Sequence, residues 1–485
     1  MMPEKLDYKK LGLRCGLEIH QQLNTQHKLF CNCSTQMKEK IPSLIIKRKL
    51  HPVASELGEI DTAAQFEYFR NRSFNYQVYT NENCLVELDE EPPHELNQEA
   101  LNIALQIALL FNCQIPEEIE MMRKIVIDGS NTSGFQRTAI VGMNGYMRYK
   151  GQKIEIVQIS LEEDAAAIEK TENENVTYRL NRLGVPLVEI DTGILSDYTP
   201  EEIQEIAYLI GIMCRSTSKT KTGIGAIRQD INISIRRGAR VEVKGVQELG
   251  LISKVIENEV KRQITLPKVV EETRIANLDG TTDFARPLPG AGRMYPETDI
   301  KPILINKEHL DSIKKNLPEP WMKKLERFKS NFRLSPQLAE EIIQSEYLDM
   351  FEKIVSSKKV EPAIVANTFT SVIKDLERRE KVEIDRIQKH RLMEIFDYLQ
   401  DKKIIKESIP EIIKYLASYP QNGVGDAIRE LDLRPLTVSD VRNIAKDIVS
   451  QPNITFEKAY GIVMSKVRGK IDAQEVMRIV KDMMK

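Results

Sequence analysis

The sequence predicts a mixed α/β (α+β) domain followed by an all-helical region. At 485 residues the chain exceeds the ~250–300 residues that one hydrophobic core usually serves, so two or three domains are expected. Before about residue 302, short β-rich runs such as Lys153–Ile159 and Val185–Ile190 alternate with turns rich in Gly, Asn and Asp. After it, segments such as Arg386–Asp401 repeat apolar residues at helical spacing.

Three domains are predicted from the places where this pattern changes. Residues 1–302 form the α/β domain, in which helical periodicity is confined to patches at 99–111 and 200–214. Residues 303–410 form a helical domain. Because proline ends or interrupts helices, Pro410 marks the predicted start of a small helical tail at 411–485.

The composition excludes several classes of protein. Hydrophobic residues at 41% and charged residues at 29% are typical of a folded globular chain rather than a disordered one. A net charge of −2 means that any nucleic-acid contact must come from local basic patches. Six scattered cysteines, a charged N-terminus and the lack of an apolar run near ~18 residues indicate a soluble cytoplasmic protein in a reducing compartment.

Acidic side chains and one imidazole recur at predicted strand ends. The segments are Glu18 with His20, Glu162 to Asp164, Glu189 with Asp191, and Arg228 with Asp230. In a strand the period of two places Glu18 and His20 on one face, with Leu17 and Ile19 on the other. Oxygen-rich sites with one nitrogen suit Mg²⁺ or Mn²⁺. Each segment alone also fits a solvated strand edge, but a nearby cation would relieve the repulsion within the 162–164 run.

Two further motifs are weaker signals. Residues 128–138 combine Gly with small hydroxyl residues and Arg137, which suits either a phosphate contact or an ordinary tight loop, and the Walker A spacing is absent. Cys31 and Cys33 are too close for a usual CxxC zinc knuckle, and Cys84 stands alone, so zinc is a minor alternative. No motif of a covalent nucleophile such as GxSxG is present.

The C-terminus carries a comb of basic residues, Lys466, Arg468 and Lys470. Placed on a helix and the following turn they could meet a phosphate backbone, although charge alone equally fits a solvated helix face. Arg442 and Lys446, one helical turn apart, are secondary candidates for the same role.

Several motifs occur in an order that resembles one family. They are CGLEIH (15–20), ISLEEDA (159–165), NRLGVPLVEID (181–191), IRQD (227–230) and KVRGKID (466–472). Together they resemble the GatB/GatE family of glutamyl-tRNA(Gln) amidotransferase subunits, and EEPPH (90–94) and DGSNTSGFQRT (128–138) fit the archaeal GatE branch better than GatB. The resemblance runs from about residue 11 to the end. It implies a cradle-shaped α/β catalytic domain, a helical domain and a YqeY-like tail.

The resemblance also implies an activity and its residues. Such a ligase uses ATP and Mg²⁺ to phosphorylate the γ-carboxylate of glutamate esterified to tRNA(Gln), and ammonia then displaces the phosphate to give Gln-tRNA(Gln). The implied metal ligands are His20, Glu163 and Glu189, with Glu18, Glu162 and Asp230 for a second or water-mediated cation; Glu18, His20, Glu163 and Glu189 form the expected catalytic set. Ser130, Asn131, Ser133 and Arg137 are secondary candidates for contact with ATP or the acyl phosphate.

By the same resemblance the ammonia comes from a GatD-type, asparaginase-like glutaminase, in a heterotetramer with two copies of each protein. The other expected partner is tRNA(Gln) charged with glutamate, bound partly through the C-terminal basic residues, and neither DNA nor a membrane is expected. One departure stands out. GatE proteins normally carry an insertion resembling a domain of bacterial aspartyl-tRNA synthetase before the motif at Glu272, and here only residues 264–271 connect Gln263 to that motif.

Two other functions remain open at this point. A catalytically silent module that escorts Glu-tRNA would leave the carboxylates structural. A GatB-like specificity that includes Asp-tRNA(Asn) would require a GatA-type partner. Reconstitution with each amidase separates the second of these from the GatE prediction.

Overall fold

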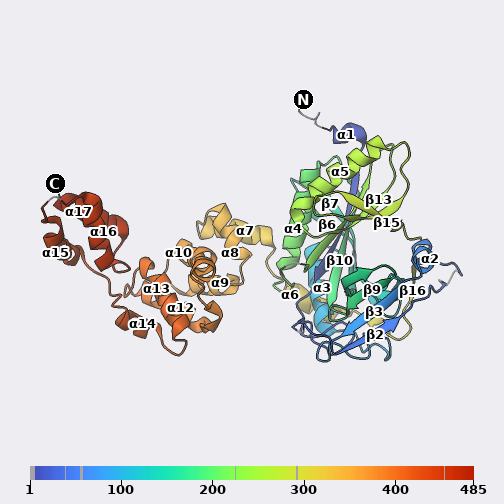
Figure 1. The fold of residues 1–485 in the computed structure, drawn as a ribbon, viewed down its shortest axis with the longest axis horizontal. Coiled ribbons are helices and arrows are strands. Elements are labelled where there is room, and N and C mark those ends of the chain that lie inside the picture. Colours follow the sequence, from blue (N-terminus) through green and yellow to red (C-terminus); the bar gives the residue numbers. More distant parts are fainter. Residues whose placement is uncertain are drawn as a thin grey trace. The chain divides into compact units, whose positions relative to one another are not determined.

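The computed structural model describes residues 6–38, 40–54, 58–223, 225–290, 293–452 and 454–484. The chain divides into two compact units, Met1–Pro320 and Trp321–Lys485. The first contains the β-structure, and within the described residues the second is helical (Figure 1). The predicted fold class, a mixed α/β domain followed by a helical region, is confirmed.

A large, mostly antiparallel sheet forms the centre of the first unit. In spatial order its strands are β15 (Thr282–Pro287), β14 (Glu272–Ala276), β13 (Val241–Val246), β12 (Ile227–Ser234), β1 (Arg14–Gln22), β10 (Pro186–Thr192), β7 (Gln152–Glu163), β6 (Phe135–Tyr149), β5 (Met122–Ile125) and β16 (Met294–Pro296). The short β11 (Leu195–Ser196) also pairs with β1, and only β13 and β14 run parallel among these pairs of described strands.

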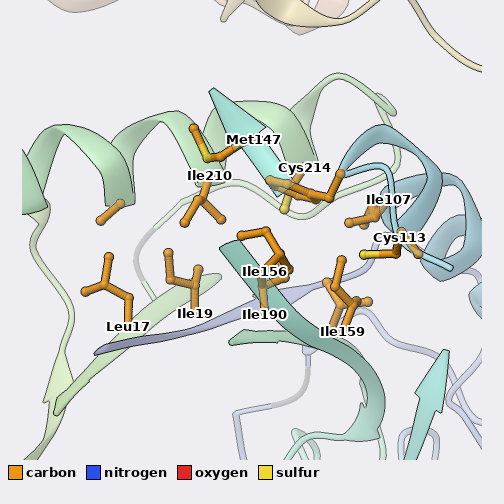
Figure 2. Close-up of a cluster of buried hydrophobic side chains, with 14 of the residues drawn as sticks. Leu17, Ile19, Ile107, Cys113, Met147, Ile156, Ile159, Ile190, Ile210 and Cys214 are labelled. Atoms are coloured by element: carbon orange, nitrogen blue, oxygen red, sulfur yellow. The ribbon is translucent and has the colours of Figure 1, made fainter. Parts of the chain in front are cut away.

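One face of this sheet is apolar and covered by helices. Leu17 and Ile19 of β1 are fully buried there, beside Ile190 of β10 and Ile159 of β7 (Figure 2). The covering helices are α3 (Gln98–Leu110), α4 (Pro200–Arg215) and α5 (Ile252–Thr265). The period of two in β1 therefore sends Glu18 and His20 to the opposite face, as predicted.

A smaller sheet supports the loop that follows β5. Its strands are, in order, β2 (Leu44–Arg48), β3 (Ser73–Val78), β9 (Asn175–Arg179) and β8 (Ala167–Glu172). The hydroxyls of Tyr76 and Tyr178 donate to the carbonyls of Gly129 and Asp128 at 2.9 and 2.8 Å. Gly129 has a φ of 95°, and a Cβ there would lie 2.2 Å from the Phe74 ring, so only glycine fits.

The remaining elements of the first unit lie at its edges. They are α1 (Tyr8–Leu11), α2 (Thr62–Phe69), α6 (Lys307–Lys315) and the two-stranded sheet of β4 (Glu118–Ile119) and β17 (Ile303–Leu304). A connection of residues 266–271 joins α5 to β14. Arg262 pairs with Glu259 on α5 at 2.8 Å and with Glu272 on β14 at 2.9 Å, which ties the two ends of this connection together.

The second unit consists of amphipathic helices. They are α7 (Trp321–Asn331), α8 (Pro336–Ile343), α9 (Leu348–Ser357), α10 (Pro362–Asn367), α11 (Ile373–Arg379), α12 (Lys389–Gln400), α13 (Ile409–Ser418), α14 (Val424–Glu430), α15 (Val438–Val449), α16 (Phe456–Val467) and α17 (Ala473–Met483). The last three share a core of their own around Val441, Val463 and Ile479.

The structure divides once, after Pro320, which is later than the predicted boundary at 302, and the predicted boundary at 410 falls inside its second unit. Ile313 of α6 belongs to the core of the first unit, so that unit extends to Pro320. Pro410 lies in the first turn of α13, and α13 and α14 contact α12 rather than opening the three-helix tail. The reason is that proline is well tolerated at the start of a helix, where its missing N–H is not needed. Across the described part of the chain, none of the helices is long and apolar enough to cross a bilayer.

Candidate active site

A polar pocket with a cavity volume of about 260 Å³ lies on the face of the large sheet opposite the helices. Strands β1, β10, β12 and β13 supply most of its walls, and Leu288, Pro289 and Arg293 line one side. Its lining residues are Glu18, His20, Lys124, Gln136, Glu189, Asp191, Asn232, Arg240, Glu242, Lys244, Leu288, Pro289 and Arg293. We call it the carboxylate pocket.

The first group of possible metal ligands, the first ligand group, consists of His20 and Glu189, which line this pocket, and of the fully buried Glu162. One ligand atom from each lies within 4.8 Å of the others, and His20 Nε2 is 2.7 Å from Glu189 Oε2. Pairing of β1 with β10 sets His20 opposite Glu189, and β7 brings in Glu162 from the other side of β10. Lys124 Nζ donates to Glu162 Oε1 at 2.7 Å and lies 3.5 Å from Glu189 Oε2.

These contacts shift the pKa values of the group. Burial opposes the charged imidazole, but the hydrogen bond and charge of Glu189 outweigh it and raise the pKa of His20 to about 9. Burial also opposes the ionised Glu189, yet the charge of Lys124 and the hydrogen bond from His20 hold the pKa of that carboxyl well below its ordinary value. At neutral pH Glu189 is therefore ionised.

A second ligand group lies next to the first and consists of Glu18, Asp230 and Glu242. Their ligand atoms are again within 4.8 Å of one another. Lys244 Nζ lies 2.7 Å from Asp230 Oδ2 and 2.8 Å from Glu242 Oε1, and Asn232 donates to Glu18 Oε1 at 2.9 Å. Burial raises the pKa of Glu18, whereas for Asp230 the charge of Lys244 outweighs burial and lowers the pKa.

Asp191 lies between the two groups. Its Oδ2 accepts a hydrogen bond from Gln158 at 2.9 Å, while the buried Oδ1 has no hydrogen-bond partner among the described residues. Burial and the charges of Glu189 and Glu18 raise its pKa to about 8. An unpartnered buried oxygen beside like charges is the arrangement that a bound cation would relieve.

The donor set of the carboxylate pocket fits hard divalent cations. The two groups together contain five carboxylates and one imidazole, that of His20. Only two lysines, Lys124 and Lys244, are among the described residues that line the pocket. Such sites suit Mg²⁺ or Mn²⁺, which take carboxylates together with substrate phosphates. The two groups could hold one cation each.

Glu163 does not join His20 and Glu189, contrary to the grouping expected from the sequence. It faces away from the carboxylate pocket, like Leu161, because successive side chains of β7 alternate. Its Oε1 accepts a hydrogen bond from the backbone N–H of Arg137 at 2.9 Å and lies 3.5 Å from the guanidinium Nη1. Glu162 occupies the position beside His20 instead.

All four of the predicted phosphate residues also lie outside the carboxylate pocket. Asn131, Ser133 and Arg137 line a second, much smaller pocket of about 20 Å³ with Lys28 and Glu163, which we call the Arg137 pocket. Ser130 donates to Asn131 Oδ1 at 3.3 Å and does not line either pocket. Arg137 is already neutralised, because its Nε donates to Glu297 Oε2 at 2.7 Å in addition to the Glu163 contact.

Two arginines that were not predicted from the sequence lie in the carboxylate pocket. Arg240 and Arg293 line it, and neither forms an ion pair with another described residue. A guanidinium without a carboxylate partner, placed beside cation ligands, suits a phosphate group. Arg240 directly precedes β13 and Arg293 directly precedes β16, and local spacing in the sequence does not determine which pocket a residue at such a position lines.

Comparison with known proteins now gives the family. Residues 13–311 match the family described as the GatB/GatE catalytic domain, and residues 349–484 match the GatB domain that is named GatB_Yqey. The chain belongs to the GatB/GatE family. Both ligand groups, at 18–20, 162, 189, 230 and 242, fall inside the segment that matches the family's catalytic domain.

Curated relatives extend this family likeness over the whole chain. A Methanocaldococcus jannaschii protein, named as the E subunit of glutamyl-tRNA(Gln) amidotransferase, is 36% identical, with 99% of this chain and 100% of that protein covered. Proteins of the same name from Saccharolobus solfataricus and Methanococcus maripaludis are each 34% identical, with 99% and 96% of this chain covered and 99% and 97% of the relatives. The first alignment spans 629 positions, more than the 485 residues of this chain, so that relative carries residues that are missing here.

Within this family member, three cysteines and a glutamate form a further cluster of possible metal ligands. Cys31, Cys33, Cys84 and Glu87 have ligand atoms within 4.8 Å of one another, so Cys84 does not stand alone, contrary to the sequence-based expectation. Lys28 Nζ lies 2.8 Å from Glu87 Oε1. Three thiols with one carboxylate suit Zn²⁺ better than Mg²⁺. The long separation between Cys33 and Cys84 hid the fourfold pattern in the sequence.

The predicted tRNA-binding residues lie on or beside the last helices. Arg442 and Lys446 are exposed on α15, Lys466 is exposed near the end of α16, and Arg468 is exposed just after it. Lys470 is half-buried, and its Nζ pairs with Asp432 Oδ2 at 2.6 Å. Four of the five cations are thus presented to solvent without a described ion-pair partner, and Lys470 is not.

Proposed function

We propose that this chain is the synthetase subunit of a tRNA-dependent amidotransferase that converts Glu-tRNA(Gln) to Gln-tRNA(Gln). The observation that carries the proposal is the carboxylate pocket, where two adjacent ligand groups and two arginines without carboxylate partners occur within a GatB/GatE catalytic domain. The curated relatives are named as the E subunits of an enzyme with this substrate. We propose ATP and Mg²⁺ as its cosubstrate and cofactor.

The proposed chemistry has two balanced steps. A γ-carboxylate oxygen of the esterified glutamate attacks the terminal phosphorus of ATP, and ADP leaves with the electron pair of the broken P–O bond. Ammonia then attacks the carbonyl carbon of the acyl phosphate, inorganic phosphate leaves, and the nitrogen loses one proton to form the amide. Both steps develop charge on oxygen, which positioned cations spread rather than covalent participation of the protein.

The chain's own residues would divide the work as follows. His20, Glu162 and Glu189 would hold one cation, and Glu18, Asp230 and Glu242 the other. Bound Mg²⁺ would supply neutralisation of phosphate oxygens. Arg240 and Arg293 would bind the phosphates directly, while Lys124 and Lys244 orient the ligand carboxylates through their ion pairs.

A partner has to deliver the ammonia. Free ammonia is mostly protonated at neutral pH, so a separate amidase that releases it next to the pocket is chemically sensible, and the sequence shows no nucleophile motif of its own. We propose a GatD-type glutaminase, two copies with two of this chain, as that partner. Exposed Arg442, Lys446, Lys466 and Arg468 would hold the tRNA through its phosphates.

The test is reconstitution. The chain is mixed with an archaeal GatD-type amidase, Glu-tRNA(Gln), Mg²⁺ and glutamine, with and without ATP, and the aminoacyl group is identified after hydrolysis. Strictly ATP-dependent formation of glutamine supports the proposal. Tight tRNA binding without conversion would favour a silent escort module. Conversion of Asp-tRNA(Asn) with a GatA-type amidase instead would favour GatB-like specificity.

A further inference from the structure

An exposed cluster of aromatic side chains lies beside the carboxylate pocket. Phe69 and Tyr68 at the end of α2 are 73% and 44% exposed, and Phe284 on β15 is 51% exposed. Phe66 joins them, because its ring meets that of Phe284 edge-on with centroids 6.0 Å apart. We call these four residues the aromatic rim.

The aromatic rim is fixed to the wall of the carboxylate pocket. The hydroxyl of Thr62 at the start of α2 donates to the carbonyl of Leu288 at 3.2 Å, and the N–H of Gly290 donates to Asp61 at 2.7 Å. Leu288 and Pro289 line that pocket. On its inner side α2 packs through Ala64 against Ile125 of β5 and against Tyr295 of β16, the strand beside which it lies in Figure 1. The rim therefore keeps its place relative to the ligand groups.

One cation lies over a ring of the rim, and two more lie near the end of α2. Arg70 lies over the ring of Phe66 at 5.8 Å while its Nη1 pairs with the buried Glu67 at 3.1 Å. Arg72 lies 3.9 Å from the same Glu67, and exposed Lys49 donates to Asn71 at 2.8 Å, just beyond the end of α2. Large exposed aromatic side chains with positive charge beside them are a stacking platform for unpaired nucleotides, since every base has a face to stack and every linkage has a phosphate.

We propose that the aromatic rim stacks on the unpaired nucleotides at the 3′ end of the tRNA and so delivers the esterified amino acid into the carboxylate pocket. This inference rests on the proposed function for the identity of the RNA. The amino acid of any aminoacyl-tRNA is carried on the terminal nucleotide of a single-stranded end, so that end must pass the mouth of the pocket in which the ester reacts. Sequence-specific RNA contacts favour such splayed, unstacked bases over the duplex. A protein partner on the same rings is the competing occupant.

The test compares two uncharged tRNAs, one intact and one lacking its unpaired 3′ nucleotides, in a filter-binding assay with the full chain at fixed salt. Wild-type protein should bind the intact tRNA more tightly. Phe69→Ala should weaken binding of the intact tRNA roughly tenfold and leave the truncated one unchanged, because one stacked base is lost. Phe69→Trp should restore the difference. Tyr419→Ala, which removes a similarly exposed ring on the second unit, is the matched control and should change neither.

Three results would overturn the inference. Wild-type protein that binds both tRNAs equally has no contact with the 3′ end. A Phe69→Ala loss of equal size on both tRNAs places the ring against another part of the RNA. A Phe69→Ala variant that binds both tRNAs as tightly as wild type would show that the ring does not contact the RNA, and would favour the protein partner. The assay needs neither ATP nor the amidase, so a failure of the proposed amidation reaction leaves its outcome readable.

Discussion

The carboxylate pocket and the Arg137 pocket lie on opposite sides of the same strand, and their charges are arranged in different ways. In the Arg137 pocket the charges are paired, because Arg137 contacts Glu163 and Glu297, and Lys28 contacts Glu87. In the carboxylate pocket the acids exceed the lysines, and Asp191 keeps a buried oxygen without a described partner. A buried charge with a partner is already compensated, whereas a buried polar atom without one, among groups with shifted pKa values, indicates a place where something binds. Glu162 belongs to the first ligand group of the carboxylate pocket, whereas Glu163, the next residue, lines the Arg137 pocket.

The difference between the two pockets is tested most directly by neutralising Glu162 and Glu163 in separate variants. Glu162→Gln removes a ligand charge and should lower ATP-dependent amidation by roughly 100-fold or more. Glu163→Gln keeps an oxygen that can accept the Arg137 N–H bond and should stay within about fivefold of wild type. Single-turnover kinetics at saturating Mg²⁺ provide the measurement. Equal losses in the two variants would mean that the pockets share the chemistry.

A second prediction concerns the two arginines of the carboxylate pocket. Arg240→Ala and Arg293→Ala should each raise the KM for ATP roughly tenfold, because each removes a charge-assisted phosphate contact. Arg237→Ala, an exposed arginine that does not line the pocket, serves as the control. Initial rates at varied ATP give both constants. An unchanged KM would assign these arginines to another part of the substrate.

The cysteine cluster offers a third prediction, by metal removal. If Cys31, Cys33, Cys84 and Glu87 hold Zn²⁺, a chelator should lower the Tm of the wild-type chain by several degrees and release zinc. Cys84→Ser should carry less zinc, and the chelator should scarcely change its Tm. Atomic absorption and thermal unfolding are measured on the same samples. If wild-type protein contains no zinc and its Tm is the same with and without chelator, the three cysteines do not hold a metal.

The smallest expected effect is a pH dependence of stability in the chelated, metal-free chain. The pKa of His20 is raised to about 9 from an unfolded value near 6.5, so its contribution is fully present below about pH 6.5 and disappears as the pH rises through about 9. Wild-type Tm should therefore fall over that window by more than the Tm of His20→Gln. Parallel curves for the two proteins would show that the Glu189 contact adds no net stability.

Part of this arrangement was readable from the sequence. The alternation around Leu17 and Glu18 gave the two faces of β1, and the order of the acidic motifs indicated the family. Among the features that were not readable are the choice of Glu162 over Glu163, the participation of Glu242 with Lys244, and the approach of Cys84 to Cys31. Each depends on which strands become neighbours, or on where a strand's alternation begins, and local spacing does not determine either. The activity, its cofactors and its partners remain predictions.

The joint between α5 and β14 shows how such a chain can change length without losing its pocket. The strands on either side of the joint, β13 and β14, are neighbours in the sheet, and Arg262 pins both ends of the six-residue span 266–271. A segment inserted there, whether a short span or a whole domain, would begin and end at the same two fixed points, the end of α5 and the start of β14. The length of this connection can therefore change during evolution, while the pairing of β12 with β13, and with it the positions of Asp230 and Glu242, stays the same.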